Sequence, residues 1–247
     1  DDNKYYTGDT VTLEMAGATG AFADKNVGSD KAVTISGLAL SGADAGNYTV
    51  TDASNATATI TAKAITATGV TASDKVYNAN TTASINTGAA GLTGGAAADD
   101  DKKYYDGDTV ILEKAGATGA FADKNVDNNK AVTVSGLALS GEDAGNYTVT
   151  DNSGATANIT AKAITSTGIT ASNKVYNANT VATLNTGTAV LTGGAVADDD
   201  NKYYTGDTVT LDTSGAAGLF ADKTVANNKA VTISGLALSG ADAGNYT

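Results

Sequence analysis

Apolar and polar residues alternate over several short stretches of this chain, in the period of two that places side chains on opposite faces of a β-strand. Val, Ile, Thr and Tyr give these stretches a high strand propensity, and clusters such as AGATG and TGG between them are typical of turns. In the first part of the chain the alternating stretches are residues 9–14 (DTVTLE), 31–40 (KAVTISGLAL), 47–51 (NYTVT) and 56–66 (ATATITAKAIT). Because no long segment shows the helical period of about 3.6 residues, the pattern predicts an all-β protein.

The pattern recurs with a constant period of 99 residues, so that Tyr5, Tyr104 and Tyr203 are equivalent positions. Residues 1–63 are identical to residues 100–162 at 51 of 63 positions. Solenoid coils repeat about every 20–50 residues, whereas a period near 100 residues is the size of a small domain. We therefore predict a partial repeat over residues 1–62, a complete repeat over 63–161 and a repeat over 162–247 that lacks its last strand.

Several short strands at this spacing favour tandem immunoglobulin-like β-sandwich repeats, with a β-grasp-like repeat as the alternative fold. We predict that the boundaries between repeats lie near Lys63 and Lys162. In the sequence ATITAKAITATG, Ile60 and Ile65 are five residues apart. On one continuous strand they would face opposite sides, so that each could enter the core of a different repeat.

The phrase S-G-x-D-A-G-N-Y occurs three times and precedes an alternating strand in its first two copies. An Asp-x-Gly-x-Tyr sequence in this position is typical of a tyrosine corner, in which the Tyr hydroxyl bonds to the backbone a few residues upstream. The Asp would accept turn N–H groups and the Gly would permit a positive φ. We predict three such tyrosine corners with a structural role, formed by Asp44, Gly46, Tyr48, Asp143, Gly145, Tyr147, Asp242, Gly244 and Tyr246.

An acidic run, AADDDKKYYDGDT, occupies residues 97–109. Carboxylate oxygens are the ligands that Ca²⁺ prefers, six to eight of them at a time. The candidate calcium ligands are Asp99, Asp100, Asp101, Asp106 and Asp108. Since the spacing matches neither an EF-hand loop nor a nonapeptide calcium repeat, the alternative is a solvated acidic loop. No other cofactor is expected.

Composition excludes several classes of function. The net charge is −12 and all 15 basic residues are Lys, which argues against a nucleic-acid partner because phosphate contacts need basic patches. No stretch is long and apolar enough for insertion into a membrane. Without Cys or His, Ser–His and Cys–His catalysis is excluded, and we predict that the protein is not an enzyme.

The segments VTISGLALSGADAGNYTVT (33–51) and ATITAKAITATGVTASDKVYNANTTASI (58–85), with their copies 99 residues further on, resemble the YDG-type repeats of large bacterial adhesins. Those repeats occur in filamentous-haemagglutinin-like proteins exported by two-partner secretion. The resemblance covers essentially the whole chain. The family's Tyr-Asp-Gly reads Tyr-Asn-Ala at Tyr77 and Tyr176, while Tyr105, Asp106 and Gly107 spell it elsewhere in the repeat. The resemblance implies a secreted, surface-exposed stalk or fibre.

The expected function is therefore structural: stalk repeats of a bacterial surface adhesin that project a binding region and support adhesion or biofilm. The expected partners are neighbouring repeats of the same chain. Two alternatives remain open. One is a filament subunit that assembles with copies of itself, because incomplete sandwiches leave edge strands unpaired. The other is a module that binds host or matrix glycan through exposed Tyr and Asp side chains.

Overall fold

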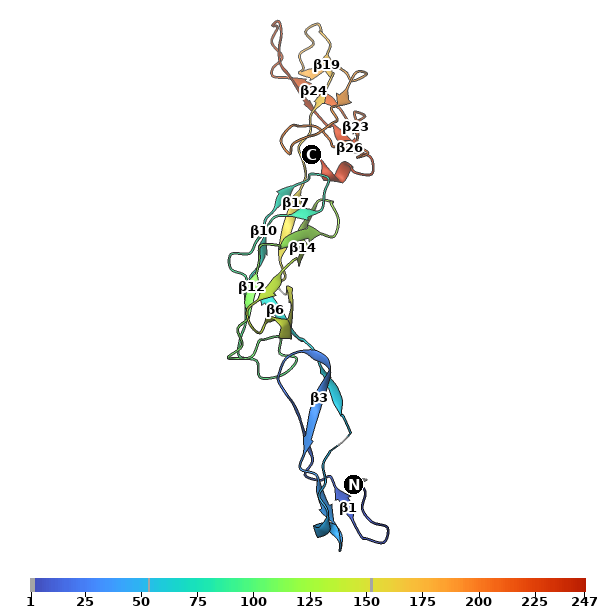
Figure 1. The fold of residues 1–247 in the computed structure, drawn as a ribbon. Coiled ribbons are helices and arrows are strands. Elements are labelled where there is room, and N and C mark those ends of the chain that lie inside the picture. Colours follow the sequence, from blue (N-terminus) through green and yellow to red (C-terminus); the bar gives the residue numbers. More distant parts are fainter. Residues whose placement is uncertain (1–2, 53, 152) are drawn as a thin grey trace. The chain divides into compact units, whose positions relative to one another are not determined.

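The computed structural model describes residues 3–52, 54–151 and 153–247 (Figure 1). The partial repeat predicted over 1–62 therefore includes three residues, 1–2 and 53, that lie outside the described ones. The chain is all-β, as the sequence predicts, with many small sheets that are compatible with β-sandwich repeats. Its contacts divide it into two compact units. Unit 1 is Asp1–Ala67, Gly91–Glu113 and Leu137–Thr150, and unit 2 is Thr68–Ala90, Lys114–Gly136 and Asp151–Thr247.

Both units take segments from more than one 99-residue repeat. The second repeat contributes three segments to unit 1 and three to unit 2, because its strands alternate between two groups of sheets. The predicted boundaries near Lys63 and Lys162 stay a prediction. The expected single strand over 56–66 is divided: one strand ends at Ile60 and the next begins at Lys63, in a different sheet.

Unit 1 contains strands of three to nine residues, one two-residue strand and two short 3₁₀ turns. They are β1 (Thr12–Glu14), β2 (Thr19–Phe22), β3 (Gly28–Ser36), β4 (Ala39–Ser41), η1 (Ala45–Asn47), β5 (Thr57–Ile60), β6 (Lys63–Thr68), β11 (Gly91–Leu92), β12 (Ile111–Glu113), β15 (Ala138–Ser140), η2 (Ala144–Asn146) and β16 (Tyr147–Asp151). β6 and β16 each end one residue beyond the unit. The sheets are β1–β4, β2–β3–β5, β11–β6–β16 and β12–β15.

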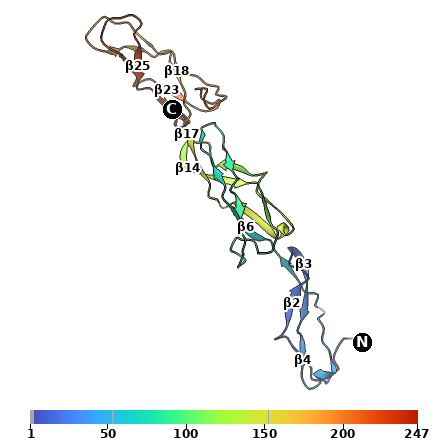
Figure 2. The same cartoon turned by 90° about the vertical axis from the view of Figure 1, so that its left-hand side faces the viewer.

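Unit 2 contains the remaining elements. They are β7 (Thr71–Ala72), β8 (Lys75–Val76), β9 (Thr82–Ala83), β10 (Ile85–Asn86), β13 (Thr118–Phe121), β14 (Asp127–Ser135), β17 (Thr156–Thr160), β18 (Ser166–Thr167), β19 (Thr170–Ala171), β20 (Val181–Ala182), β21 (Leu184–Asn185), β22 (Val190–Leu191), β23 (Thr210–Asp212), β24 (Ala217–Phe220), β25 (Val231–Ser234), β26 (Ala237–Ser239) and η3 (Ala243–Asn245). Its largest sheet has the strand order β8–β17–β14–β13–β9, and β14 and β17 lie side by side in Figure 2.

The core of unit 2 forms on this five-stranded sheet. Alternation along β17 buries Ala157 and Ile159 against Phe121 and Val132, and Tyr77 packs into the same cluster. Complete burial of an Ile or Phe side chain contributes about 1.5–3 kcal/mol. The predicted alternation of apolar and polar residues is therefore what builds this core.

Strand propensity alone does not decide where strands form. The NYTVT sequence of the second repeat forms β16, which pairs with β6. The identical NYTVT of the first repeat, residues 47–51, forms no strand. The same sequence takes the two conformations because strand structure requires a hydrogen-bonding neighbour as well as suitable side chains. Among the described residues, no helix is long and apolar enough to cross a membrane.

Candidate functional site at the repeat junction

The candidate site is the junction between successive repeats, and the repeated S-G-x-D-A-G-N-Y phrase supplies one side of it. Each copy turns through a three-residue 3₁₀ helix and then places its Tyr in extended backbone. The Asp does not cap this turn. Instead, the Oδ2 atom of Asp143 accepts the backbone N–H of Thr109 at 2.9 Å, and Asp44 and Asp242 make the same bond in the other copies. The Asp therefore does accept a backbone N–H, but the donor lies 34 residues away and not in the turn as expected.

The prediction that Gly46, Gly145 and Gly244 permit a positive φ is wrong, because none of the three has one. The glycine with positive φ stands four residues earlier in the phrase, and at Gly141 φ is 109°. A Cβ on Gly141 would lie 2.3 Å from the carbonyl oxygen of Thr109. The first glycine of the phrase, rather than the second, therefore allows the segment after β15 to approach the segment before β12 closely.

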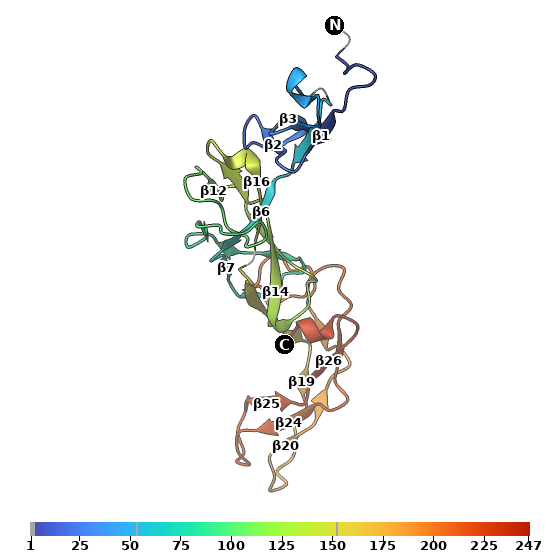
Figure 3. The same cartoon turned by 90° about the horizontal axis from the view of Figure 1, so that it is seen from below.

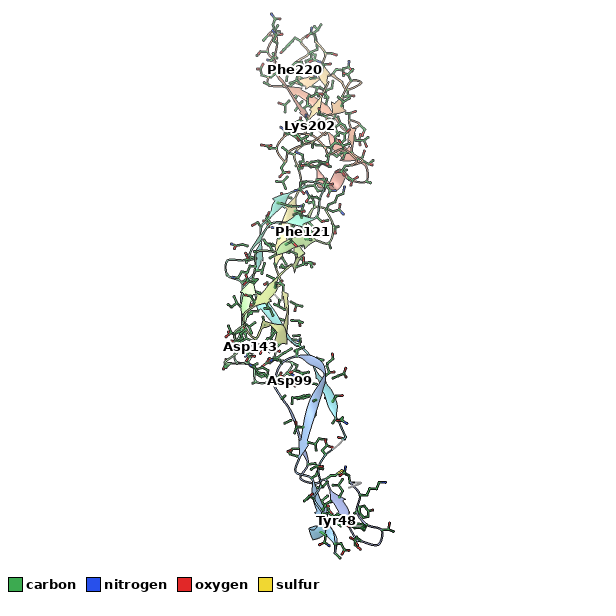
Figure 4. The ribbon with its side chains drawn as sticks, viewed as in Figure 1. Tyr48, Asp99, Phe121, Asp143, Lys202 and Phe220 are labelled. Carbon is green, nitrogen blue, oxygen red and sulfur yellow. The ribbon has the colours of Figure 1, made fainter. Side chains whose placement is uncertain are left out.

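The Tyr hydroxyl links the phrase to residues far upstream. Tyr147 donates to the Oδ2 atom of Asp108 at 2.6 Å and accepts the backbone N–H of Tyr105 at 3.1 Å. The same bonds join Tyr48 (Figure 4) to Asp9 and Tyr6, and Tyr246 to Asp207 and Tyr204. The backbone partner is 42 residues away, not a few residues upstream as in the expected corner. The hydroxyl thus connects two segments that are far apart in the sequence instead of closing a local turn.

The carboxylate that receives this hydroxyl also receives a Lys from the preceding repeat. In unit 1, Lys25 pairs with Asp108 and, at 2.9 Å, with Asp143 (Figure 4). In unit 2, Lys124 pairs with Asp207 at 2.5 Å and with Asp242 at 3.4 Å. Asp108 and Asp143 raise the pKa of the Lys25 ammonium, and Asp207 and Tyr77 raise the pKa of the Lys124 ammonium. The same ionic junction therefore forms twice, 99 residues apart.

A pair of asparagines adds a neutral clamp to each junction. The Oδ1 atom of Asn146 accepts the backbone N–H of Val27 at 2.9 Å, and its Nδ2 donates to Asn26 at 3.2 Å. Asn245 binds Val126 and Asn125 at the same distances. Asn146 and Asn245 belong to the repeated phrase. The Asp and the Asn of the phrase contact the preceding repeat directly, and its Tyr binds the carboxylate that pairs with the Lys of the preceding repeat.

Unit 2 shows a further part of the junction. Tyr77 is fully buried, and its hydroxyl donates to the Oδ2 atom of Asp207 at 2.7 Å. Its ring packs edge-on against Tyr246 and Tyr204, with centroids 5.3 and 6.1 Å apart. Burial opposes ionisation of Asp207, yet the hydrogen bonds from Lys124, Tyr246 and Tyr77 hold its pKa below the ordinary value. One carboxylate thus collects donors from two successive repeats.

The structure disperses the predicted calcium ligands. The Oδ1 atom of Asp101 binds the Nζ of Lys63 at 3.0 Å, and that ammonium also donates to the Asp99 carbonyl at 2.8 Å. Asp108 lies at the junction with Lys25. Asp106 lies beside Gly95, and Asp100 is exposed. Within the described ranges no group of three or more acidic side chains is placed to hold a metal ion.

A Lys ammonium lies in the acidic loop of the second repeat, where Ca²⁺ was the predicted cation, and in the equivalent loop of the third repeat. In the third repeat, Lys162 is completely buried and donates to the carbonyls of Ala197 and Asp198 at 2.7 and 2.8 Å and to the Oδ1 atom of Asp200 at 2.9 Å. Lys63 makes the equivalent three bonds one repeat earlier. The acidic loop is therefore organised around an internal lysine.

The sequence pattern did not identify Lys25, Lys124, Tyr77, Lys63 or Lys162 as functional residues. A signal for the first two was present, because A-D-K-N-V occurs at residues 23–27 and again at 122–126. Recurrence shows that a position matters in every repeat. It does not show which residue in the next repeat it contacts.

A family model described as a YDG domain matches the chain three times, over residues 2–57, 61–155 and 160–247. This chain belongs to the YDG domain family. The matches cover nearly all of the sequence, so the YDG domain is the unit that the 99-residue period repeats. Comparison of these YDG repeats with curated proteins and with solved structures found no match.

Proposed function

We propose that these YDG repeats form part of the stalk of a long, secreted bacterial surface adhesin of the filamentous-haemagglutinin-like class exported by two-partner secretion. The stalk carries a binding region away from the cell surface and supports adhesion or biofilm formation. The observation that carries this proposal is the recurrence of one junction, Lys25 with Asp108 and Asp143, then Lys124 with Asp207 and Asp242.

A recurring junction suits a structural role because donor and acceptor lie on different surfaces of the repeat. Such heterologous contacts can be continued by adding further copies, and the stability of the array then depends on nearest-neighbour contacts. The net charge of −12 adds solubility and mutual repulsion between stalks at low salt. Neither property requires a substrate or a cofactor.

The proposal is tested in the bacterium that produces the protein. Antibodies against the purified 247-residue chain should label intact cells, and protease added outside the cells should remove the label. Deletion of one whole 99-residue repeat should leave secretion intact and reduce adhesion, because the binding region lies closer to the cell. Label confined to the cytoplasm, or adhesion that does not depend on repeat number, would contradict the stalk function.

Glycan binding is distinguished by a direct measurement. We expect the 247-residue chain to bind no member of an array of host and matrix glycans, since the stalk only positions the binding region. Specific binding that is lost when the exposed Tyr6 is replaced by Ala, while the fold is retained, would favour the ligand-binding function instead.

A further inference from the structure

Strand β17, the last strand of the second repeat, lies between two neighbours in its sheet. On one side it pairs antiparallel with β14, the nine-residue strand labelled in Figure 3. On the other side it pairs in parallel with β8, where Ile159 lies opposite Lys75 and Thr160 opposite Val76. All of these residues belong to unit 2. Hydrogen bonds therefore hold β17 along both of its edges.

Further hydrogen bonds extend the pairing of β8 with β17 at both ends. The Oδ1 atom of Asp74 accepts the backbone N–H of Asn158 at 2.7 Å, and its Oδ2 atom accepts the Nδ2 group of the same residue at 2.9 Å. The backbone N–H of Tyr77 donates to the carbonyl of Thr160 at 2.8 Å. Both bonds from Asn158 lower the pKa of Asp74, so they are made to an ionised carboxylate, the stronger kind of hydrogen bond.

The inner face of β17 is buried as well. Ala157 and Ile159 are 4% and 1% exposed, and they belong to the same core cluster as Phe121 and Val132. A strand that leaves this position exposes apolar surface to water at the same time as its hydrogen bonds break. Displacement of β17 is therefore opposed by its packing and by both of its strand neighbours.

The direction of the chain decides how tension reaches this pair. The preceding repeat comes before β8 in the sequence, and the following repeat continues from the end of β17. Tension along the chain therefore pulls β8 toward its N-terminal end and β17 toward its C-terminal end. Because the two strands are parallel, these pulls act lengthwise and in opposite directions, so that all the bonds between the strands resist together. Strands that are pulled apart sideways lose their bonds one after another, at a lower force.

The end of β17 is attached to the third repeat with almost no slack. Ala161 alone separates β17 from Lys162. The backbone N–H of Lys162 donates to the carbonyl of Asn245 at 3.0 Å, and its buried ammonium binds Asp200 at 2.9 Å. Both partners belong to the third repeat, and all four residues lie in unit 2. Tension in the third repeat therefore passes directly to β17.

We propose that the β8–β17 pair is the part of the second repeat that resists tension along the chain. Opening the repeat by tension requires the two strands to slide past each other, which breaks their ladder and the bonds between Asp74 and Asn158 together. The inference deepens the stalk function and rests on it for its biological use, because a stalk transmits the pull on its binding region. The resistance itself belongs to the purified chain and is measured there.

The test is single-molecule force spectroscopy of the 247-residue chain, which has no Cys, so that two introduced cysteines define where force is applied. Ser73→Cys with Ala163→Cys pulls β8 and β17 lengthwise in opposite directions. Asn128→Cys with Ala163→Cys pulls β14 and β17 apart from one end, because Asp127 lies opposite Ile159. The three substituted positions are exposed. At the same force, the chain should open at least about tenfold more slowly in the lengthwise geometry, since forced opening follows the unfolding barrier.

A second pair of variants tests the side-chain bonds. Asp74→Ala should raise the opening rate at least about tenfold in the lengthwise geometry, because two bonds to a carboxylate are lost, and by less than about twofold in the sideways geometry.

Asp123→Ala is the matched control. It removes an exposed carboxylate that also accepts one backbone N–H and one side-chain donor, from Asn125 and Lys130, outside the β8–β17 pair. It should change the lengthwise opening rate by less than about twofold. Equal opening rates in the two geometries overturn the proposal, as does a lengthwise rate that Asp74→Ala leaves unchanged. Neither result bears on whether the protein lies on the cell surface, which the antibody labelling of cells decides separately.

Discussion

At the scale of the residue, the feature that distinguishes this protein is the pairing of each buried lysine or tyrosine with a carboxylate. A buried charge is stable only when it is paired and its hydrogen bonds are satisfied. Lys162 meets both conditions with three acceptors, and Asp207 does so with Lys124, Tyr77 and Tyr246. Every buried polar side-chain atom among the described residues has a partner.

Replacement of Lys162 by Met should lower the free energy of unfolding by about 3–5 kcal/mol, the cost of breaking a buried ion pair by removing one partner. Lys63→Met removes the equivalent bonds from a side chain that is partly exposed, so its cost should be smaller. Chemical denaturation of both variants measures the difference. Equal costs would show that burial of Lys162 adds nothing to its pairing.

Acid should destabilise the protein through the same carboxylates. The N–H of Val196 and, against the opposing effect of burial, the ammonium of Lys162 hold the pKa of Asp200 well below its ordinary value of 3.8. A depressed pKa in the folded state contributes stability above the ordinary pKa, and that stability is lost as the pH falls below it. The melting temperature should therefore fall steeply below about pH 4, and less steeply in Asp200→Asn.

At the scale of the element, the structure depends on close approach between strands as much as on side-chain packing. Gly141 brings the end of β15 against Thr109, and Tyr147 then bonds back to Asp108 on the same segment. β16 follows directly and pairs with β6. The close approach at Gly141, the hydrogen bond from the Tyr147 hydroxyl and the pairing of β16 with β6 therefore all stabilise the same short stretch of sequence.

Gly141→Ala should destabilise the chain by about 2 kcal/mol or more, since φ is 109° and the new Cβ would meet the Thr109 carbonyl. Gly145→Ala is the control from the same phrase, because a Cβ there has no heavy atom within 4 Å. Its effect should stay within about 0.5 kcal/mol. Thermal unfolding of the two variants decides between these positions, and comparable losses would contradict the structural role of Gly141.

The strands could largely be predicted from the sequence, and their partners could not. Alternation of apolar and polar residues marks β1, β3 and β5 because that pattern depends on local side-chain periodicity. The contacts of Lys25 join residues 83 and 118 positions apart, from Asp108 to Asp143. A fixed period identifies equivalent residues in each repeat but carries no information on which of them touch across a junction.

At the scale of the whole molecule, the chain is a series of equivalent junctions instead of one dominant core. The junction of Lys124 with Asp207 and Asp242 in unit 2 has the same pattern as that of Lys25 with Asp108 and Asp143 in unit 1. Lys223 is the third lysine of this series; it is exposed and forms no ion pair with any described residue. Lys223 therefore serves as the control position for substitutions of Lys25 and Lys124.

Lys124→Met should lower the free energy of unfolding by about 1 kcal/mol, at the low end for a hydrogen bond to a charged group because the side chain is one-third exposed. Lys223→Met should change it by less than about 0.5 kcal/mol. Urea denaturation of both variants gives the comparison. A larger effect at Lys223 would mean that the junction is not the source of the stabilisation.

Chelation should leave the protein unchanged. Lys63 and Lys162 supply the positive charge that the acidic loops need, so EDTA should shift neither the melting temperature nor the sedimentation coefficient. Calorimetry measures the melting temperature with EDTA and with added Ca²⁺, and sedimentation velocity measures the sedimentation coefficient under the same two conditions. A rise in melting temperature with Ca²⁺ that is lost in Asp101→Asn would restore the calcium hypothesis for this loop.

The shared carboxylate at each junction also constrains how such a protein can change in length. Asp207 needs Tyr77 and Lys124 from the preceding repeat, and Tyr246 from its own. Recombination that adds or removes a whole number of 99-residue periods keeps a Lys from the preceding repeat and a Tyr from its own repeat for each junction carboxylate. A deletion of any other length joins a donor segment to the wrong acceptor. Whole-repeat gain and loss is therefore the route by which variants with different numbers of repeats can arise without redesign of a single contact.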